Sequence, residues 1–225
     1  MTEEKQFNLI LLGPPGAGKG TQAGLLVNAY DLLHVSTGDM LRSAIKEGSA
    51  TGLKAQEYMS KGELVPDSIV TQLVVDRMGK PDASGGVILD GFPRTKPQAE
   101  ALDNSLKENG RTIDVVLYVN ASLDVIIQRL TGRRVCPECG MNYHITNIPP
   151  RKEGVCDTCN VDLFQREDDE PETVKNRLVV YEKSTKDLIG YYREKGLLEE
   201  VNGDISAEEL FEEVDSLFRG EGLVK

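Results

Sequence analysis

The segment Gly13–Thr21, with the sequence GPPGAGKGT, constrains the fold of this chain more than any other feature. It fits the pattern G-x-x-x-x-G-K, follows the apolar run Phe7–Leu12 and precedes a helical pattern, which is the context of a phosphate-binding loop. Glycines let backbone N–H groups turn toward phosphate oxygens, and the N-terminus of the following helix adds partial positive charge. Lys19 supplies a point charge for the β and γ phosphates. An incidental glycine-rich turn is the alternative, and this context disfavours it.

The residue after that lysine departs from the usual pattern. Gly20 stands where a serine or threonine is common, and Thr21 follows one place later. This departure weakens the case for direct hydroxyl coordination of magnesium and narrows the nucleotide-binding families that fit.

Apolar runs recur along the chain with helical patterns between them. Several runs are continuous, as expected of strands that are covered on both faces. The alternation predicts an α/β fold in which helices wrap a parallel sheet. Ser36, Ser206 and Pro171 are placed to begin helices. The runs are Phe7–Leu12, Leu33–Ser36, Val87–Leu89, Val115–Val119 and Leu198–Val201.

Two segments interrupt this alternation and are interpreted as excursions from one core. Residues 37–65 are predicted to form two short helices, with Gly48, Gly52 and Gly62 as breaks. Residues 132–169 are rich in proline, glycine, cysteine and charge and show little helical period. The core is accordingly assigned to residues 1–36, 66–131 and 170–225.

Two further local predictions concern the last third of the chain. A single long helix is expected from about Pro171 to Lys195, with Gly190 as a weak point near its end. The acidic run Glu167–Glu170 is interpreted as a solvated face.

Charge and hydropathy exclude several classes of protein. The 225 residues include 26 Lys and Arg against 37 Asp and Glu, a net charge of −11, whereas binding to a phosphate backbone requires clustered cations. No apolar run approaches the roughly 18 residues of a membrane span, and the acidic N-terminus is a poor secretory signal. We therefore expect a cytoplasmic protein without nucleic-acid or membrane partners. A monomer is the default expectation for its oligomeric state.

A second motif, LDGFPR, directly follows the third apolar run. An aspartate at the end of a strand beside a phosphate loop is placed to hold magnesium, directly or through water, and Asp90 takes that role. Arg94 can grip a phosphate with its guanidinium fork. Alone, the motif is equally consistent with a strand that ends in a turn with an exposed arginine; together with the phosphate loop, the functional interpretation is favoured.

Seven arginines are scattered between these motifs. Arg129 and Arg133 lie four positions apart, so on a continuing helix they share one face. Each arginine alone is most simply a surface charge, but together they suit a phosphoryl-transfer site, where charge on the transferring group must be neutralised. The set is Arg42, Arg94, Arg129, Arg133, Arg134, Arg166 and Arg177.

The cysteines form two close pairs with 16 residues between the pairs, a C-x₂-C-x₁₆-C-x₂-C pattern typical of a tetrahedral zinc site. Four thiolates leave no open coordination position, so the metal is expected to be structural. Two disulfides, a redox pair and an iron site remain alternatives. The ligands are Cys136, Cys139, Cys156 and Cys159.

No hydrolytic triad is apparent. His34 and His144 are the two histidines of the chain, and neither lies near a nucleophile pattern. Each is predicted to be a packing or surface residue.

Four motifs together resemble those of the adenylate kinase family: GPPGAGKGTQ at 13–22, STGDMLR at 36–42, LDGFPRT at 89–95 and GRR at 132–134. The region around Arg166 supports the resemblance, which covers essentially the whole chain. It implies a five-stranded parallel core, a helical AMP-binding insertion at 37–65, and a lid at 132–169 of the long, zinc-bearing form.

The resemblance also implies a reaction, the reversible transfer of a phosphoryl group from ATP to AMP that gives two ADP, with magnesium on ATP. A kinase for another monophosphate such as UMP or CMP is a close alternative. A nucleotide-dependent switch or a zinc-ribbon binding module without turnover is a more distant one.

Site residues follow from the same resemblance. The ATP positions are Gly16, Ala17, Gly18, Lys19, Gly20, Thr21, Arg129, Arg133, Asn142, Tyr143 and Ile205. The AMP positions are Thr37, Arg42, Glu63, Leu64, Val65, Gly91, Phe92, Pro93, Arg94, Gln98, Arg166 and Arg177. The positions expected to act in catalysis are Lys19, Asp90, Arg94, Arg133, Arg166 and Arg177.

Overall fold

The computed structural model describes residues 6–224, and a five-stranded parallel sheet lies at its centre. The strand order is β2-β3-β1-β4-β7, and all four pairings are parallel. Each strand coincides with one of the five predicted apolar runs, so the predicted α/β fold is confirmed. The strands are β1 (Phe7–Leu12), β2 (Leu33–Ser36), β3 (Gly86–Asp90), β4 (Val115–Asn120) and β7 (Leu198–Asn202).

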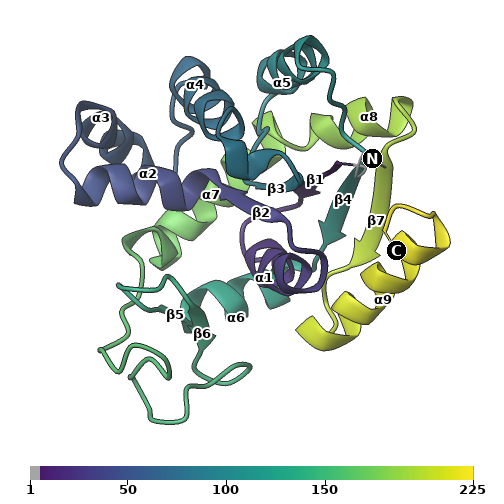
Figure 1. The fold of residues 1–225 in the computed structure, drawn as a ribbon. Coiled ribbons are helices and arrows are strands. Elements are labelled where there is room, and N and C mark those ends of the chain that lie inside the picture. Colours follow the sequence, from purple (N-terminus) through teal and green to yellow (C-terminus); the bar gives the residue numbers. More distant parts are fainter. Residues whose placement is uncertain (1–5, 225) are drawn as a thin grey trace.

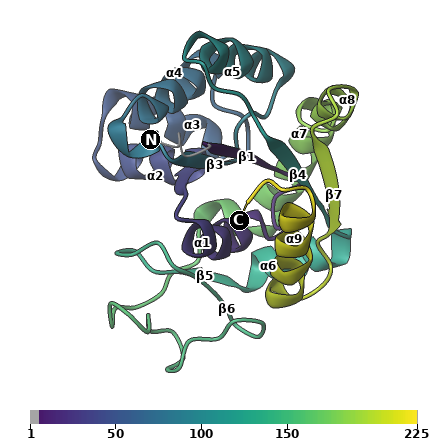
Figure 2. The same ribbon diagram turned by 45° about the vertical axis from the view of Figure 1, so that its right-hand side comes forward.

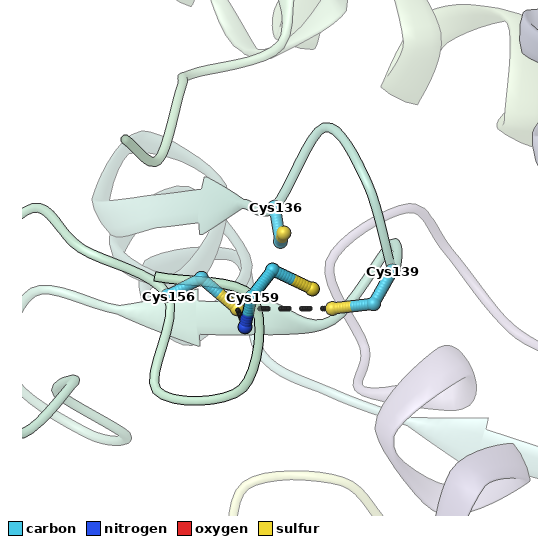
Figure 3. A group of neighbouring side chains, drawn as sticks. All are labelled: Cys136, Cys139, Cys156 and Cys159. Atoms are coloured by element: carbon cyan, nitrogen blue, oxygen red, sulfur yellow. Dashed lines mark hydrogen bonds between the residues drawn. The ribbon is translucent and has the colours of Figure 1, made fainter. Parts of the chain in front are cut away.

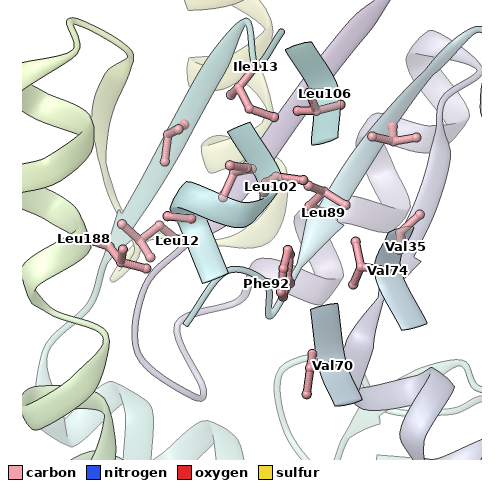
Figure 4. Packing of buried hydrophobic residues seen from close by; sticks show 14 of the residues in the cluster. Leu12, Val35, Val70, Val74, Leu89, Phe92, Leu102, Leu106, Ile113 and Leu188 are labelled. Atoms are coloured by element: carbon pink, nitrogen blue, oxygen red, sulfur yellow. The ribbon is translucent and has the colours of Figure 1, made fainter. Parts of the chain in front are cut away.

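Helices cover both faces of this sheet (Figure 1). Side chains alternate along β1, so Leu9 and Leu11 join one apolar cluster while Ile10 and Leu12 join the other. The first cluster includes residues of α1 (Lys19–Tyr30) and α9 (Ala207–Gly220). The second, drawn in Figure 4, includes residues of α4 (Asp67–Met78), α5 (Lys96–Glu108) and α8 (Asp187–Glu194). The continuous apolar strands are thus buried from both sides.

The first excursion forms α2 (Thr37–Lys46) and α3 (Ala50–Met59), as predicted. Ser36 caps α2 by accepting from the Asp39 N–H. Gly48 separates the two helices with φ +67°, but the prediction that Gly52 is a break is wrong, because Gly52 lies inside α3. A Cβ there would penetrate the Ala44 carbonyl of α2, so glycine lets the two helices approach closely.

The second excursion leaves the core after α6 (Leu123–Gly132) and carries little regular structure (Figure 2). The strands β5 (Arg133–Val135) and β6 (Asn142–His144) form an antiparallel pair, and the short helix η2 (Glu167–Asp169) closes the segment. Its small buried cluster includes Cys136, Tyr143 and Cys156. The cysteines therefore stand at the centre of a segment with almost no other core.

The prediction of one long helix after Glu170 is wrong. The structure has α7 (Pro171–Ser184) and α8, with a break at Thr185 and Lys186, whose N–H groups both donate to Tyr181 O. Helix α7 packs against α6, whereas α8 packs against α5 and β7. Gly190, the expected weak point, lies inside α8.

The sequence predicts that the chain consists of one core and two excursions. The division into a core of residues 1–36, 66–131 and 170–225 and the two excursions stays a prediction, and residues 1–5 and 225 lie outside the described residues. A short helix, η1 (Pro81–Ala83), precedes β3.

Within residues 6–224 no helix combines the length and the apolar character needed to cross a membrane.

Two helical glycines give a matched test of the packing between α2 and α3. We expect Gly52→Ala to lower the free energy of unfolding by about 1–3 kcal/mol, because the added methyl group meets the backbone of α2. Gly24→Ala, on the exposed side of α1 with open space around it, should raise it by about 0.4–1 kcal/mol. Thermal or denaturant unfolding measures both. Equal effects of the two substitutions would contradict the close approach of α2 and α3.

Candidate active site

A cavity of about 670 Å³ lies at the carboxyl ends of β1 and β3. Its walls come from the phosphate loop, the end of β3, both excursions, α6, α7 and the segment between β7 and α9. The carboxyl edge of an open parallel sheet is where ligands of α/β proteins bind. One cavity therefore brings together segments from the whole length of the chain.

The phosphate loop forms the floor of this cavity. Gly13 has φ +145°, and a Cβ there would lie 2.5 Å from Val119 O, so only glycine fits beside β4. Helix α1 begins at Lys19, so its unpaired N-terminal N–H groups face the loop. Lys19 Nζ donates to Gly13 O and Pro14 O, each at 2.8 Å. The lysine is thus folded over the loop that is to receive phosphate.

Burial lowers the pKa of Lys19 to about 8; Asp90 opposes this shift, and Arg94, Arg177 and Arg133 add to it. Burial favours the neutral form of Asp90, but His34 and Lys19 outweigh burial, and the pKa of the carboxyl falls below its usual value. Asp90 is therefore ionised beside a lysine that releases its proton more easily than usual.

His34 lies beside this pair, with Nε2 3.5 Å from Asp90 Oδ2. Contrary to the prediction that it is a packing or surface residue, His34, the second residue of β2, lines the cavity. No motif marks it. Parallel pairing of β2 with β3 brings Ser36 opposite Asp90 and so carries the end of β2 to the same edge.

Several guanidinium groups lie close to one another in the lining of the cavity. Burial, together with the nearby Arg177, lowers the pKa of Arg94 to about 10. Burial likewise lowers the pKa of Arg166 to about 10, with Arg42 and Arg133 contributing. Each group is held close to other cations and away from water, so an anion that enters the cavity relieves this repulsion.

Two carboxylates hold these arginines in place. Asp169 is 0% exposed and accepts from Arg133 Nε at 2.7 Å and from Arg177 at 3.2 Å. Asp168 lies 3.1 Å from Arg177. The prediction that the acidic run is a solvated face is therefore wrong for its two aspartates: the short helix η2 turns them inward, where arginines fix their charge.

A third carboxylate joins the two excursions. Asp39, on α2, pairs with Arg42 at 2.6 Å and with Arg166 of the second excursion at 3.5 Å. Lys46 of α2 also donates to Pro137 O at 3.5 Å. The two excursions thus touch each other over the cavity.

Arg129 connects α6 to the far side of the cavity. It donates to Ala17 O at 3.1 Å, to Gly203 O at 2.7 Å and to Ile205 O at 2.9 Å. The prediction that Arg129 and Arg133 share one face of a continuing helix is wrong. Helix α6 ends at Gly132, and Arg133 has extended backbone angles. Both arginines nevertheless line the cavity.

Nearly all predicted nucleotide-binding residues line this one cavity. The exception among them is Phe92, which is 1% exposed and packs in the apolar cluster with α4 and α5. Among the seven arginines singled out in the sequence, Arg134 does not line the cavity and donates to Thr131 O and Arg133 O instead. Tyr181 and Thr185 line it without any motif, because the break between α7 and α8 places them there.

The four cysteines lie together outside this cavity (Figure 3). None forms a disulfide, and their sulfur atoms all lie within 4.8 Å of one another. Turns at Gly140 (φ +72°) and Asn160 (φ +59°) follow the two pairs. The Tyr143 hydroxyl lies 3.5 Å from Cys156 Sγ. The segments 136–139 and 156–159 are thereby brought together at one site.

This cluster fits a tetrahedral metal. Zinc–sulfur bonds of about 2.3 Å imply sulfur–sulfur distances of about 3.8 Å, and Cys139 Sγ lies 3.7 Å from Cys156 Sγ. The Cys159 backbone N–H and the Tyr143 hydroxyl lower the pKa of Cys156 to about 6, so a thiolate ligand is available at neutral pH. A disulfide would require about 2.05 Å between sulfur atoms, so the cluster is compatible with zinc rather than with two disulfides.

Comparisons with known proteins agree with this geometry. The family model described as Adenylate kinase matches residues 11–197. An adenylate kinase of Carboxydothermus hydrogenoformans is 54% identical over 205 residues, which cover 91% of this chain and 96% of the relative. An adenylate kinase of a Geobacillus species is 50% identical over 214 residues, which cover 95% and 99%. One of Desulfitobacterium hafniense is 51% identical over 212 residues, which cover 94% and 98%. The chain therefore belongs to the adenylate kinase family.

Proposed function

We propose that this chain transfers the terminal phosphoryl group of ATP to AMP while both nucleotides lie end to end in the cavity. Relatives named adenylate kinase at about 50% identity over most of the chain support the reaction. The observation that carries its assignment to this site is the convergence of the phosphate loop, Asp90 and arginines from three segments on one cavity.

ATP takes the side of the cavity formed by the phosphate loop and the second excursion. Backbone N–H groups of Gly16–Thr21 surround its phosphates, and Lys19 exchanges its two backbone acceptors for phosphate oxygens. Arg129 lies beside its base, near the Ile205 carbonyl. Asn142 and Tyr143 cover it from the lid, residues 132–169.

AMP takes the side formed by α2, α3 and the end of β3. Arg42 and Arg94 hold its phosphate, and the stretch 63–65 lies along its base together with Gln98. The Thr37 hydroxyl donates to Gly91 O at 2.9 Å and so ties the start of the first excursion to the turn after Asp90. Arg166 and Arg177 stand between the two nucleotides.

Catalysis then depends on position and charge. No protein nucleophile is required, because a phosphate oxygen of AMP attacks the γ phosphorus in line while the β–γ bridging oxygen of ATP leaves with its electron pair. The arginines and Lys19 neutralise charge that spreads over the transferring group. Asp90 is the residue that would hold magnesium, which when bound to ATP supplies further charge neutralisation. Closure of the two excursions keeps water, the competing acceptor, out of the cavity.

The metal of the cysteine cluster has no part in this chemistry. We propose that it is zinc, held by four thiolates with no open position, and that it gives the lid a rigid centre that its sparse apolar residues cannot supply. A monomeric state, a cytoplasmic location and the absence of nucleic-acid partners remain predictions.

The acceptor preference tests the proposal directly. ADP formation should require a monophosphate, and the kcat/KM for AMP should exceed that for UMP and CMP. Lys19→Met should leave the fold intact and lower kcat by at least about a hundredfold, because it removes one positive charge that neutralises the transferring group. Coupled ADP assays and circular dichroism provide the measurements. Equal turnover of UMP, or a Lys19→Met variant with near-normal kcat, would contradict the assignment.

The lowered pKa of Lys19 predicts proton uptake when ATP binds. At about pH 8.5 most Lys19 side chains are neutral, and phosphate charges raise the pKa again, so each binding event takes up a fraction of a proton. Calorimetry in buffers of different ionisation enthalpy measures this fraction, which should fall toward zero near pH 7. Lys19→Met should abolish it, whereas Lys107→Met, on the exposed end of α5, should not.

Metal removal tests the structural role of the cysteine cluster. Purified, reduced protein should hold about one zinc per chain, and a chelator should lower Tm and expose residues 132–169 to proteolysis while the core stays folded. Added zinc should restore both, because folding of the lid and metal binding are linked. Elemental analysis, thermal unfolding and limited proteolysis measure these effects, and protein without any bound metal would refute the role.

A further inference from the structure

A closed ring of hydrogen bonds lies directly behind the AMP side of the cavity. Asp67, the first residue of α4, accepts from Gln98 Nε2 through Oδ1 at 2.7 Å and from the Thr95 hydroxyl through Oδ2 at 2.8 Å. The Arg94 backbone N–H donates to Gln98 Oε1 at 2.7 Å. The Gln98 N–H donates to the Thr95 hydroxyl at 3.3 Å and completes the ring.

This ring fixes which way the Gln98 amide points. A backbone N–H can only donate and an ionised carboxylate can only accept, so Oε1 must face Arg94 N and Nε2 must face Asp67. The reversed amide would set N–H against N–H and oxygen against carboxylate. Both ends of the side chain therefore have a partner that permits a single orientation.

The fixed amide still has hydrogen-bonding capacity toward the cavity. Gln98 is 2% exposed and lines the cavity, whereas Asp67 does not. An amide oxygen has two lone pairs and an amide nitrogen two hydrogens, and the ring uses one of each. One acceptor and one donor remain, in a fixed order within the amide plane. Leu64, Val65 and Val70 line the cavity as well and provide apolar surface for a flat base.

We propose that Asp67 is a positioning residue that makes the acceptor site select a 6-aminopurine over a 6-oxopurine. The Watson–Crick edge of adenine presents a donor at N6 and an acceptor at N1, which complement the free Oε1 lone pair and the free Nε2–H. Hypoxanthine and guanine present an acceptor at O6 and a donor at N1, which meet like groups unless the amide turns over. Asp67 and Arg94 N oppose that turn, so the wrong base leaves buried polar groups unpaired.

This inference rests on the proposed binding of AMP beside Gln98, and the experiment separates the two. We would measure kcat/KM for AMP and for inosine monophosphate, which differs at the 6-oxo edge, in the wild-type protein and in Asp67→Ala and Asp67→Asn. The ratio of AMP to inosine monophosphate should fall by about tenfold or more in Asp67→Ala. It should fall less in Asp67→Asn, whose Oδ1 can still accept from Gln98. The KM for ATP should stay unchanged.

Asp76→Ala is the matched control. Asp76 lies on the same helix, is exposed, and accepts from Gln72 Nε2 at 2.7 Å, so the substitution removes the same kind of bond away from the cavity. Its selectivity ratio should equal that of the wild type. If Asp67→Ala does not fold, Asp67→Asn decides alone.

A role of Asp67 in stability only would lower kcat/KM equally for both acceptors. An unchanged ratio in the variants that fold would therefore overturn the inference while leaving AMP kinase activity in place. A wild-type protein that does not prefer AMP would instead refute the proposed function.

Discussion

The crowding of guanidinium groups above the phosphate loop is the constraint on which the rest of this structure depends. Burial and mutual repulsion lower the pKa values of Arg94 and Arg166 to about 10, so holding these charged groups close together has an electrostatic cost. Polyphosphates relieve this cost when they bind. Several of these arginines come from segments that leave the sheet, so nucleotides bound in the cavity would be contacted from both excursions.

Carboxylates make this arrangement possible in the free protein. Asp169 holds Arg133 and Arg177, and Asp39 pairs with Arg42 and Arg166, so most of the arginines keep a partner before any ligand arrives. Breaking one such pair would leave a buried charge without compensation. The network therefore preorganises the cations and fixes their directions. Asp67 plays the corresponding role for the neutral Gln98 amide, where it fixes direction rather than charge.

Most of the chemistry of the site could be predicted from sequence because it is local. The phosphate loop, the Asp90 turn and the cysteine pairs are short segments in which residue type and spacing decide the backbone geometry. The predictions that failed concern packing between distant elements. Gly52 lies where two helices approach closely. The helix after Glu170 is broken at Thr185, and its two halves pack against different partners.

The sequence by itself determined the five buried strands, the phosphate loop, the four thiols and the residue types that can neutralise phosphate. Only the tertiary structure decided which polar groups meet. The pairing of β2 with β3 brought His34 to Asp90, the turn at η2 carried Asp168 and Asp169 inward, and the start of α4 set Asp67 behind Gln98. The physical reason is that hydrogen bonds and ion pairs act over a few ångströms, so they depend on contacts between segments that no local pattern encodes.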